Sequence, residues 1–298
     1  MQNQIATMKS LTYGTELELE SITREKAIRA VQSVVGGTIA HYNDGYDTYT
    51  LTTRDGRVWK AVSDASLSSR QNSAEVVTPI LRWNDMDTLQ EVVRALRHAG
   101  ATTPSTTSQH IHVGAGQMTT KQIVNLVKLE YKQEELLIKS LGTLESRIRR
   151  YCQRTSKAFV ERLEQKAPKT MQELNVAWYG YYNASPRHYD STRYHFLNLH
   201  ALFTKGTVEW RGQNGSLHAG EIKARIILAL AMTAKAINAK CASAKGRREF
   251  NQDSAKYDMR VLLLHLGLSG EEFKNVRKHL LKYLPGNAAW KHGRRMAA

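Results

Sequence analysis

Hydrophobic and acidic residues alternate along residues 14–20, which read Gly-Thr-Glu-Leu-Glu-Leu-Glu. A period of two predicts a β-strand whose two faces meet different surroundings. The two leucines are expected to face a core, whereas the opposite face carries Glu16, Glu18 and Glu20. Same-side neighbours on a strand lie roughly 7 Å apart, so adjacent carboxylates in this row can bind one cation or two neighbouring cations. A solvated acidic face is the structural alternative.

Short β-type runs separated by turn residues predict further strands along the chain. Asn43-Asp44-Gly45 and Arg54-Asp55-Gly56 have the composition of hairpin turns. The run 193–203 alternates well enough to be a strand of its own. The additional strands are expected at residues 38–42, 46–53, 57–62, 74–80, 109–114, 193–203 and 206–211.

Apolar residues at helical spacing, bounded by capping residues, predict helices between these strands. Thr23 and Gly36 have the positions of a cap and a stop for the first helix. Thr170 and Glu173 form a capping box, and Asn84 is expected to cap another helix. The helices are expected at residues 23–35, 84–100, 119–141, around 147–154, from 170, at 219–244 and at 269–284.

The chain is strongly basic, with 43 lysines and arginines against 27 acidic residues and a net charge of +16. Such a surplus indicates an anionic partner, which can be a nucleotide, a polyacidic substrate or a nucleic acid. Cys152 and Cys241 show no disulfide or CxxC pattern, and residues 1–4 do not begin a secretory signal. The longest apolar stretch, residues 226–237, is too short to span a membrane. We therefore expect a cytoplasmic protein with no membrane partner.

Metal-capable side chains recur on the other predicted strands. They are Glu75, the pair His110 and His112, and Glu209, which lies two residues before Arg211. Carboxylates with an occasional histidine suit Mg²⁺ or Mn²⁺, and an arginine beside them can hold a phosphate. The structural alternatives are a half-buried polar face, an edge charge and a simple ion pair. No zinc motif and no phosphate-binding GxxxxGK[ST] loop is present in the sequence.

Residues 14–18, 59–67, 75–79, 110–114, 193–198 and 207–211 are six segments that, in their order along the chain, resemble those of the amidoligase family. This family belongs to the carboxylate–amine ligase superfamily, which includes glutamine synthetase and glutamate–cysteine ligase. The resemblance implies an α+β fold, with a curved antiparallel sheet of the glutamine synthetase type and helices packed on its outer face. It covers about residues 11–235, so a catalytic domain is expected over 1–245. Residues 246–298 are expected to add a helical extension, packed on the same domain, and a basic tail.

The resemblance also implies roles for single residues, with ATP and Mg²⁺ (Mn²⁺ as the alternative) as cofactors. One metal would be held by Glu16, His110 and Glu209, and a second by Glu18 and Glu75. Further acids for a third metal are not found.

Other residues resemble phosphate and substrate contacts of the family. His112 would lie near the ATP phosphates, and Arg211 would bind phosphate and act with Glu16 and Glu18 in catalysis. Arg193 is similar to a contact of phosphate or substrate. The expected substrate contacts are Asn198, Asp64 and Ser66, of which the last two match an Asp-x-Ser pattern.

The expected function is therefore ATP-dependent ligation of an acidic carboxylate, carried by an amino acid, peptide or protein, to an amine through an acyl phosphate. Two alternatives remain open from the residues themselves. The same acids and histidines could serve a metal-dependent phosphohydrolase or nuclease. A basic nucleic-acid-binding protein, with Arg147 to Arg154 and Arg294-Arg295 as its footprint, is the weaker alternative.

Overall fold

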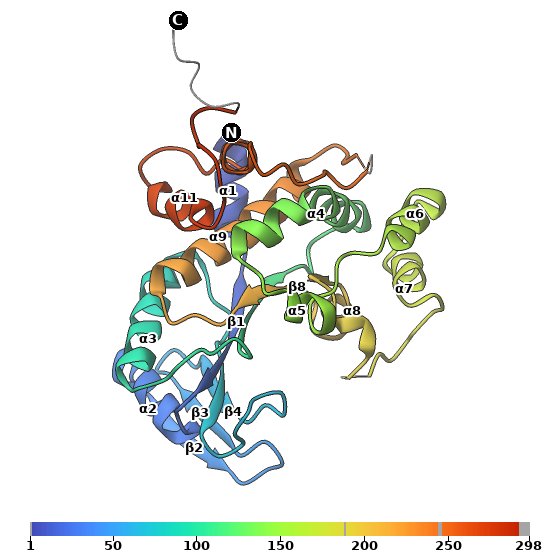
Figure 1. Cartoon of the computed structure of the whole chain (residues 1–298). Coiled ribbons are helices and arrows are strands. Elements are labelled where there is room, and N and C mark those ends of the chain that lie inside the picture. Colours follow the sequence, from blue (N-terminus) through green and yellow to red (C-terminus); the bar gives the residue numbers. More distant parts are fainter. Residues whose placement is uncertain (1, 188, 244–245, 292–298) are drawn as a thin grey trace, which may run out of the picture.

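The computed structural model describes residues 2–187, 189–243 and 246–291. Its centre is an open sheet in which every paired strand runs antiparallel to its neighbour, in the order β2-β3-β4-β5-β1-β6-β8-β7 (Figure 1). The strands are β1 (Tyr13–Glu20), β2 (Thr38–Tyr42), β3 (Thr48–Thr52), β4 (Val58–Val62), β5 (Ser73–Val77), β6 (Ser108–Gly114), β7 (Leu197–Asn198) and β8 (Thr207–Asn214). The mixed helix and antiparallel-sheet class expected from the sequence is thus confirmed.

Strand β1 lies inside the sheet, between β5 and β6. Leu17 and Leu19 are buried in the hydrophobic core, as their period-two spacing predicts. Trp210 and Val208 of β8 face the same core. The alternate residues of these strands are consequently left to the opposite face, which carries the polar side chains.

Helices cover the hydrophobic side of the sheet, with α9 at the centre of their layer (Figure 1). Helix α9 packs against α1, α3, α4 and α11, and α2 packs against α3 and β3–β5. The helices are α1 (Gln2–Ser10), α2 (Arg24–Val35), α3 (Met86–His98), α4 (Thr120–Leu141), α5 (Glu145–Arg150), α6 (Lys157–Lys166), α7 (Met171–Tyr179), α8 (His200–Lys205), α9 (Ala219–Asn238), α10 (Ala255–His265) and α11 (Lys274–Leu281), with 3₁₀ turns η1 (Trp83–Asp85) and η2 (Ser191–Arg193).

Capping residues marked several helix boundaries correctly. Thr23 accepts a hydrogen bond from the backbone N–H of Lys26 and begins α2, which ends at a glycine in the left-handed region (Gly36, φ 66°). The capping box of Thr170 and Glu173 is present at the start of α7. Asn84, in contrast, lies inside η1, and α3 begins only at Met86.

The prediction of a single strand over residues 193–203 is wrong. Only the two residues of β7 are extended, and α8 follows almost at once. The side chain of Asn198 accepts a hydrogen bond from the backbone N–H of His200, at 2.7 Å. This local bond redirects the chain from strand to helix, because Asn side chains compete with a ladder for backbone donors.

The C-terminal region differs from the expectation in three places. Helix α10 was not predicted, α9 ends at Asn238, and α11 begins at Lys274 instead of residue 269. Glu272 forms an ion pair with Lys9 of α1, at 2.7 Å. Residue 244 and most of the basic tail, including Arg294-Arg295, lie outside the described residues.

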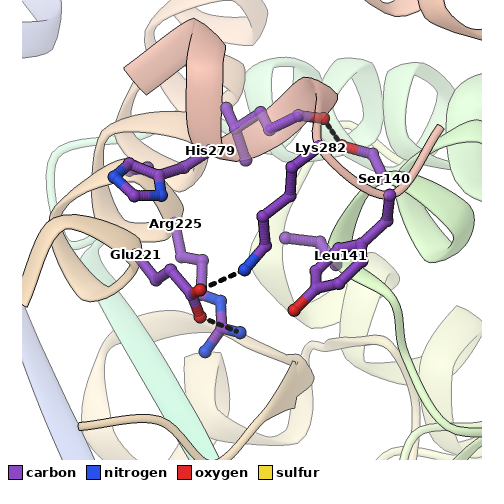
Figure 2. Close-up of a pocket in the computed structure, with 9 residues that line it drawn as sticks. Ser140, Leu141, Glu221, Arg225, His279 and Lys282 are labelled. Atoms are coloured by element: carbon purple, nitrogen blue, oxygen red, sulfur yellow. Dashed lines mark hydrogen bonds and ion pairs between the residues drawn. The ribbon is translucent and has the colours of Figure 1, made fainter. Parts of the chain in front are cut away.

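Helix α11 is fixed to α9 and α4 by polar contacts, which Figure 2 shows. Glu221 of α9 binds both Lys282 and Arg225. Ser140 of α4 donates its hydroxyl to the backbone carbonyl of Leu280, at 2.6 Å. Among the described residues, the helices are all too short or too polar to cross a membrane.

Candidate active site

The polar face of the sheet collects acids and histidines from four strands. Strand register brings them together, because directly opposite residues of antiparallel strands have Cβ atoms about 5 Å apart. The opposed pairs are Glu18 with Glu75, Glu16 with His110, and His112 with Glu209. The acids and histidines thus come from β5, β1, β6 and β8, which are neighbours in the sheet, and β7 beside β8 adds a polar side chain to the same row.

Glu16, His112 and Glu209 form one group, whose possible ligand atoms lie within 4.8 Å of one another. The Nε2 atom of His112 lies 3.3 Å from Glu16 and 3.9 Å from Glu209, and this buried atom has no hydrogen-bond partner. The other ring nitrogen, Nδ1, is 2.9 Å from the hydroxyl of Thr207. A proton on Nδ1, donated to Thr207, leaves the Nε2 lone pair for a metal ion.

Glu16, Glu75 and His110 form a second group within the same limit of 4.8 Å. Nδ1 of His110 lies 3.1 Å from Glu16, and its Nε2 lies 2.9 Å from the hydroxyl of Ser108. Glu18 accepts a hydrogen bond from the backbone N–H of Ser108, at 2.7 Å, and its other oxygen is 3.7 Å from His110. Glu16 is thus common to both groups, and each histidine belongs to one of them.

The carboxyl groups of this face have strongly divided pKa values. Burial raises the pKa of Glu75 well above its usual range, and the charges of Glu16, Asp64 and Glu18 add to the effect. Burial also opposes ionisation of Glu16 and Glu209, but His112 lowers the pKa of Glu16 well below normal. Arg211 lowers the pKa of Glu209 to about 2. Crowded acids of this kind favour a bound cation, which relieves their mutual repulsion.

Glu209 is held in place from two sides. Arg211 Nη1 contacts one carboxylate oxygen at 2.5 Å, and Asn198 donates its amide to the other at 2.6 Å. Asn198 is 1% exposed, so it orients Glu209 and does not line the cleft. Arg147 is also buried and donates to the carbonyl of Arg211, at 3.1 Å. Part of the basic run that sequence analysis assigned to a surface therefore supports the site.

A cleft of about 940 Å³ opens over this face. Asp64 and Ser66 lie on its wall, where Asp64 accepts a hydrogen bond from the backbone N–H of Ser66 at 2.6 Å. Arg193 also lines the cleft, with its guanidinium 5.6 Å from the ring centre of Tyr194. Glu20, in contrast, is outside the cleft and accepts hydrogen bonds from Ser68.

Lys205 is a cleft residue that sequence analysis missed. Its ammonium lies 3.0 Å from the same Glu16 oxygen, Oε1, that faces His112. Burial by itself would lower the pKa of Lys205, but the carboxylates of Glu16 and Glu209 raise it overall. In the sequence, Lys205 is recognisable only as the residue before Gly206, in a turn, and nothing in that pattern indicates a chemical role.

A third group, His218, Glu221 and His279, also satisfies the spacing for a metal. The carboxylate of Glu221 is already bound by Lys282 and Arg225. Two cations on this carboxylate oppose a third, so the group is better explained as the ionic contact between α9 and α11 shown in Figure 2.

An open antiparallel sheet covered by helices, with acids and histidines gathered at a cleft, defines a protein of the α+β class with a candidate metal-binding site. A family model described as "Putative amidoligase enzyme" matches residues 9–233, which is more than half of the chain. The chain therefore belongs to the amidoligase family, and the resemblance seen in the sequence is confirmed. No curated protein matches the chain.

Among solved structures, the chain is similar to a bifunctional glutathione synthetase from Pasteurella multocida. The sequence identity is 12% and the TM-score 0.40, over 95% of this chain and 48% of that structure. The chain thus spans about half the length of that structure.

Proposed function

We propose that the protein is an ATP- and Mg²⁺-dependent carboxylate–amine ligase that works through an acyl phosphate. The observation that carries this proposal is the buried Nε2 of His112, which has no hydrogen-bond partner and faces both Glu16, a residue of the cleft lining, and the buried Glu209. Membership in the amidoligase family supports the same reaction class. We further propose that the sheet is of the glutamine synthetase type, and that residues 1–245 form the catalytic domain, with residues 246–298 as its extension.

In this proposal, one metal ion is held by Glu16, His112 and Glu209, and a second by Glu16, Glu75 and His110. This arrangement differs from the assignment implied by family resemblance, because His112 replaces His110 at the first metal, and Glu16 and His110 replace Glu18 at the second. Glu18 lies beside the second group and fixes Ser108. Bound Mg²⁺ supplies charge neutralisation for phosphoryl transfer, for which Mn²⁺ can substitute.

The first step is attack by a carboxylate oxygen of the substrate on the γ-phosphorus of ATP. A new P–O bond forms, the bond to the β-phosphate oxygen breaks, and ADP leaves with the electron pair. Arg211 and Arg193 lie where cationic side chains can neutralise phosphoryl oxygens, because both line the cleft. The protein contributes mainly positioning and charge, as phosphoryl transfer requires.

In the second step, the amine nitrogen attacks the acyl carbon, the C–O bond breaks, and phosphate leaves with the electron pair. The nitrogen loses one proton, which the departing phosphate can accept. Side chains of both the early and the later part of the chain, among them Tyr46, Tyr151 and Tyr194, line the cleft in which the reaction would take place. Exclusion of water would protect the acyl phosphate from hydrolysis.

The basic side chains of the cleft favour an acidic carboxylate substrate. Lys60, Arg70 and Arg193 line the cleft together with the acids. We propose an acidic amino acid, or an acidic residue of a peptide or protein, as the carboxylate partner. Asp64 and Ser66 also line the cleft, and we propose that they contact the amine.

The test is hydroxylamine trapping with Mg·ATP and a panel of acidic amino acids and peptides. Hydroxylamine replaces the unknown amine and converts an acyl phosphate into a detectable hydroxamate. We expect a signal that requires ATP, Mg²⁺ and Glu16, and that is lost in Glu16→Gln. Glu91→Gln is the matched control, because Glu91 is an exposed acid of α3 paired with Arg94.

Cleavage of phosphoesters or nucleic acid without ATP, by the same Glu16-dependent site, would favour a phosphohydrolase instead. Steeply salt-dependent binding of DNA or RNA with no ATP binding would favour the nucleic-acid alternative. The structure weakens that alternative, since Arg147 is buried and Arg154 pairs with Glu135 at 2.5 Å.

A further inference from the structure

We propose that Lys205 is an internal counter-cation that competes with metal for Glu16 and, once displaced, contacts the anionic group of the substrate. The inference rests on the proposed function, because it concerns the metal held by Glu16. It assigns to Lys205 two successive partners, a carboxylate of the chain and an anion in the cleft.

The competition follows from the atoms around Glu16. Oxygen Oε1 faces both the ammonium of Lys205, at 3.0 Å, and the Nε2 of His112, at 3.3 Å. Mg²⁺ binds carboxylate oxygens at about 2.1 Å, so a metal on Oε1 would lie within about 5 Å of the ammonium. Two cations at this separation repel each other strongly in a part-buried site. Glu16 therefore favours one cation at a time on this oxygen.

The position of Lys205 allows it to move between partners. It is the last residue of α8, and the helix ends at Gly206 in the left-handed conformation (φ 69°), whose N–H binds the carbonyl of Ala201. The carbonyl of Gly206 accepts from Ala115, at 3.0 Å, so the backbone at this point is fixed to the sheet. The side chain itself is 47% exposed, and its four-carbon stem is flexible. A fixed backbone with a free stem lets the ammonium turn without a change in the fold.

The same cleft has the basic side chains needed to bind an anionic partner of the displaced ammonium. Lys205 lines it together with Arg193 and Arg211, which we propose as phosphate contacts. Arg211 remains committed to Glu209, through the contact at 2.5 Å. A displaced ammonium would supply a further positive charge to the transferred phosphoryl group or the substrate carboxylate. Metal binding would thereby release a cation for substrate binding.

The experiment measures Mn²⁺ binding to the full chain by electron paramagnetic resonance, for wild type, Lys205→Met, Lys205→Arg and Lys223→Met. Lys223 is the matched control, because it pairs with Asp87 on the helical side and its loss changes the net charge equally. We expect Lys205→Met to bind Mn²⁺ about tenfold more tightly, as a relieved repulsion of about 1.4 kcal/mol corresponds to tenfold in affinity. Lys205→Arg and Lys223→Met should stay near wild type.

Turnover in the hydroxylamine assay completes the test. Lys205→Met should lower kcat at saturating Mn²⁺ by about tenfold, since one charge-assisted contact is lost, and Lys205→Arg should restore most of it. Circular dichroism melting of each variant shows that the fold is retained.

The outcomes separate the two proposals. Wild-type Mn²⁺ binding with unchanged or weaker binding in Lys205→Met would overturn the role of Lys205 and leave the metal site standing. If Lys205→Met binds Mn²⁺ and wild type does not, the competition is supported. Absence of binding in both would overturn the metal site and this inference together.

Discussion

Two groups of acids with low solvent exposure differ in their surroundings. The cleft group consists of Glu16, Glu75 and Glu209, and the α4 group consists of Glu130 and Glu134. The cleft acids face imidazole nitrogens and an opening of about 940 Å³. The α4 acids are fully buried, at 0% exposure, and hydrogen bonds and an ion pair join them to Thr155 and Arg247.

The α4 group is closed by residues far along the chain. The backbone N–H of Thr155 donates to Glu134 at 2.6 Å, and the Thr155 hydroxyl donates to Glu130 at 2.8 Å. Arg247, which lies over the ring of Tyr131, binds Glu134 at 2.6 Å. Burial raises the pKa of Glu130 well above normal, and burial partly offset by Arg247 raises the pKa of Glu134 to about 7.

The difference shows that burial of carboxyl groups does not by itself identify a site. Contacts with Thr155 and Arg247, together with protonation, accommodate the α4 acids, so they can join α4 to the C-terminal region without a ligand. Ionised Glu16 and Glu209, beside the lone His112 Nε2, are instead arranged for a cation that approaches from the cleft. Unpartnered ligand atoms at the end of a cleft are the better criterion.

The largest expected effect comes from a matched pair of substitutions, one in each group. Glu16→Gln should lower turnover by about 10³-fold or more, because it removes a shared ligand of both proposed metals. Glu134→Gln should leave turnover within a few-fold of wild type, since Glu134 lies outside the cleft. Hydroxamate formation per folded protein is the measurement. Equal losses of turnover in both variants would contradict the distinction between the cleft group and the α4 group.

Metal binding should stabilise the folded state only if the cleft group is intact. A ligand present at 100 times its Kd stabilises the folded state by about 2.7 kcal/mol, which thermal unfolding detects readily. We expect this shift with Mg²⁺ or Mn²⁺ in wild type and in Glu130→Gln, and its loss in Glu16→Gln, which removes the ligand shared by both proposed metals. A shift that disappears in Glu130→Gln would instead place a metal in the α4 group.

Local patterns explain why much of the cleft was predictable from the sequence. Period-two alternation correctly assigned Leu17 to the core and Glu16 to the opposite face. The same rule put His110 and His112 on one face, and both indeed point to Glu16. Strand alternation is a short-range property, so it is present in any window of a few residues.

Contacts between distant segments explain the rest. Glu16 and Lys205 are 189 residues apart, and only the β1–β6–β8 register brings them together. Periodicity alone could not pair Glu18 with Glu75, which only the family resemblance grouped together, because strand order is not written in periodicity. The α4 acids were likewise overlooked, since their partner Arg247 comes from a segment that showed no recognisable pattern.

The pH dependence of stability should distinguish the two groups next. Glu134 has a folded pKa of about 7, above the unfolded value, so the folded state holds a proton that the unfolded state releases. This contribution is fully present below the unfolded pKa and is lost as the pH rises through about 7. Between pH 5 and 8 we expect wild type to lose about 2 kcal/mol that Glu134→Gln does not lose. Denaturant titrations at both pH values measure the difference, and identical pH profiles would contradict it.

The smallest effect is expected at the ion pair between Glu221 and Lys282, the more exposed of the two cations on this carboxylate. Lys282 is 34% exposed, so its ion pair with Glu221 is screened by solvent. Lys282→Met should therefore change the free energy of unfolding by less than about 1 kcal/mol. It should also bring no binding of Mn²⁺ to His218, Glu221 and His279, because Arg225 still occupies the carboxylate. Urea unfolding and Mn²⁺ titration of this variant test both statements. New Mn²⁺ binding would show that Lys282 alone keeps a metal from α9, as we propose for Lys205 in the cleft.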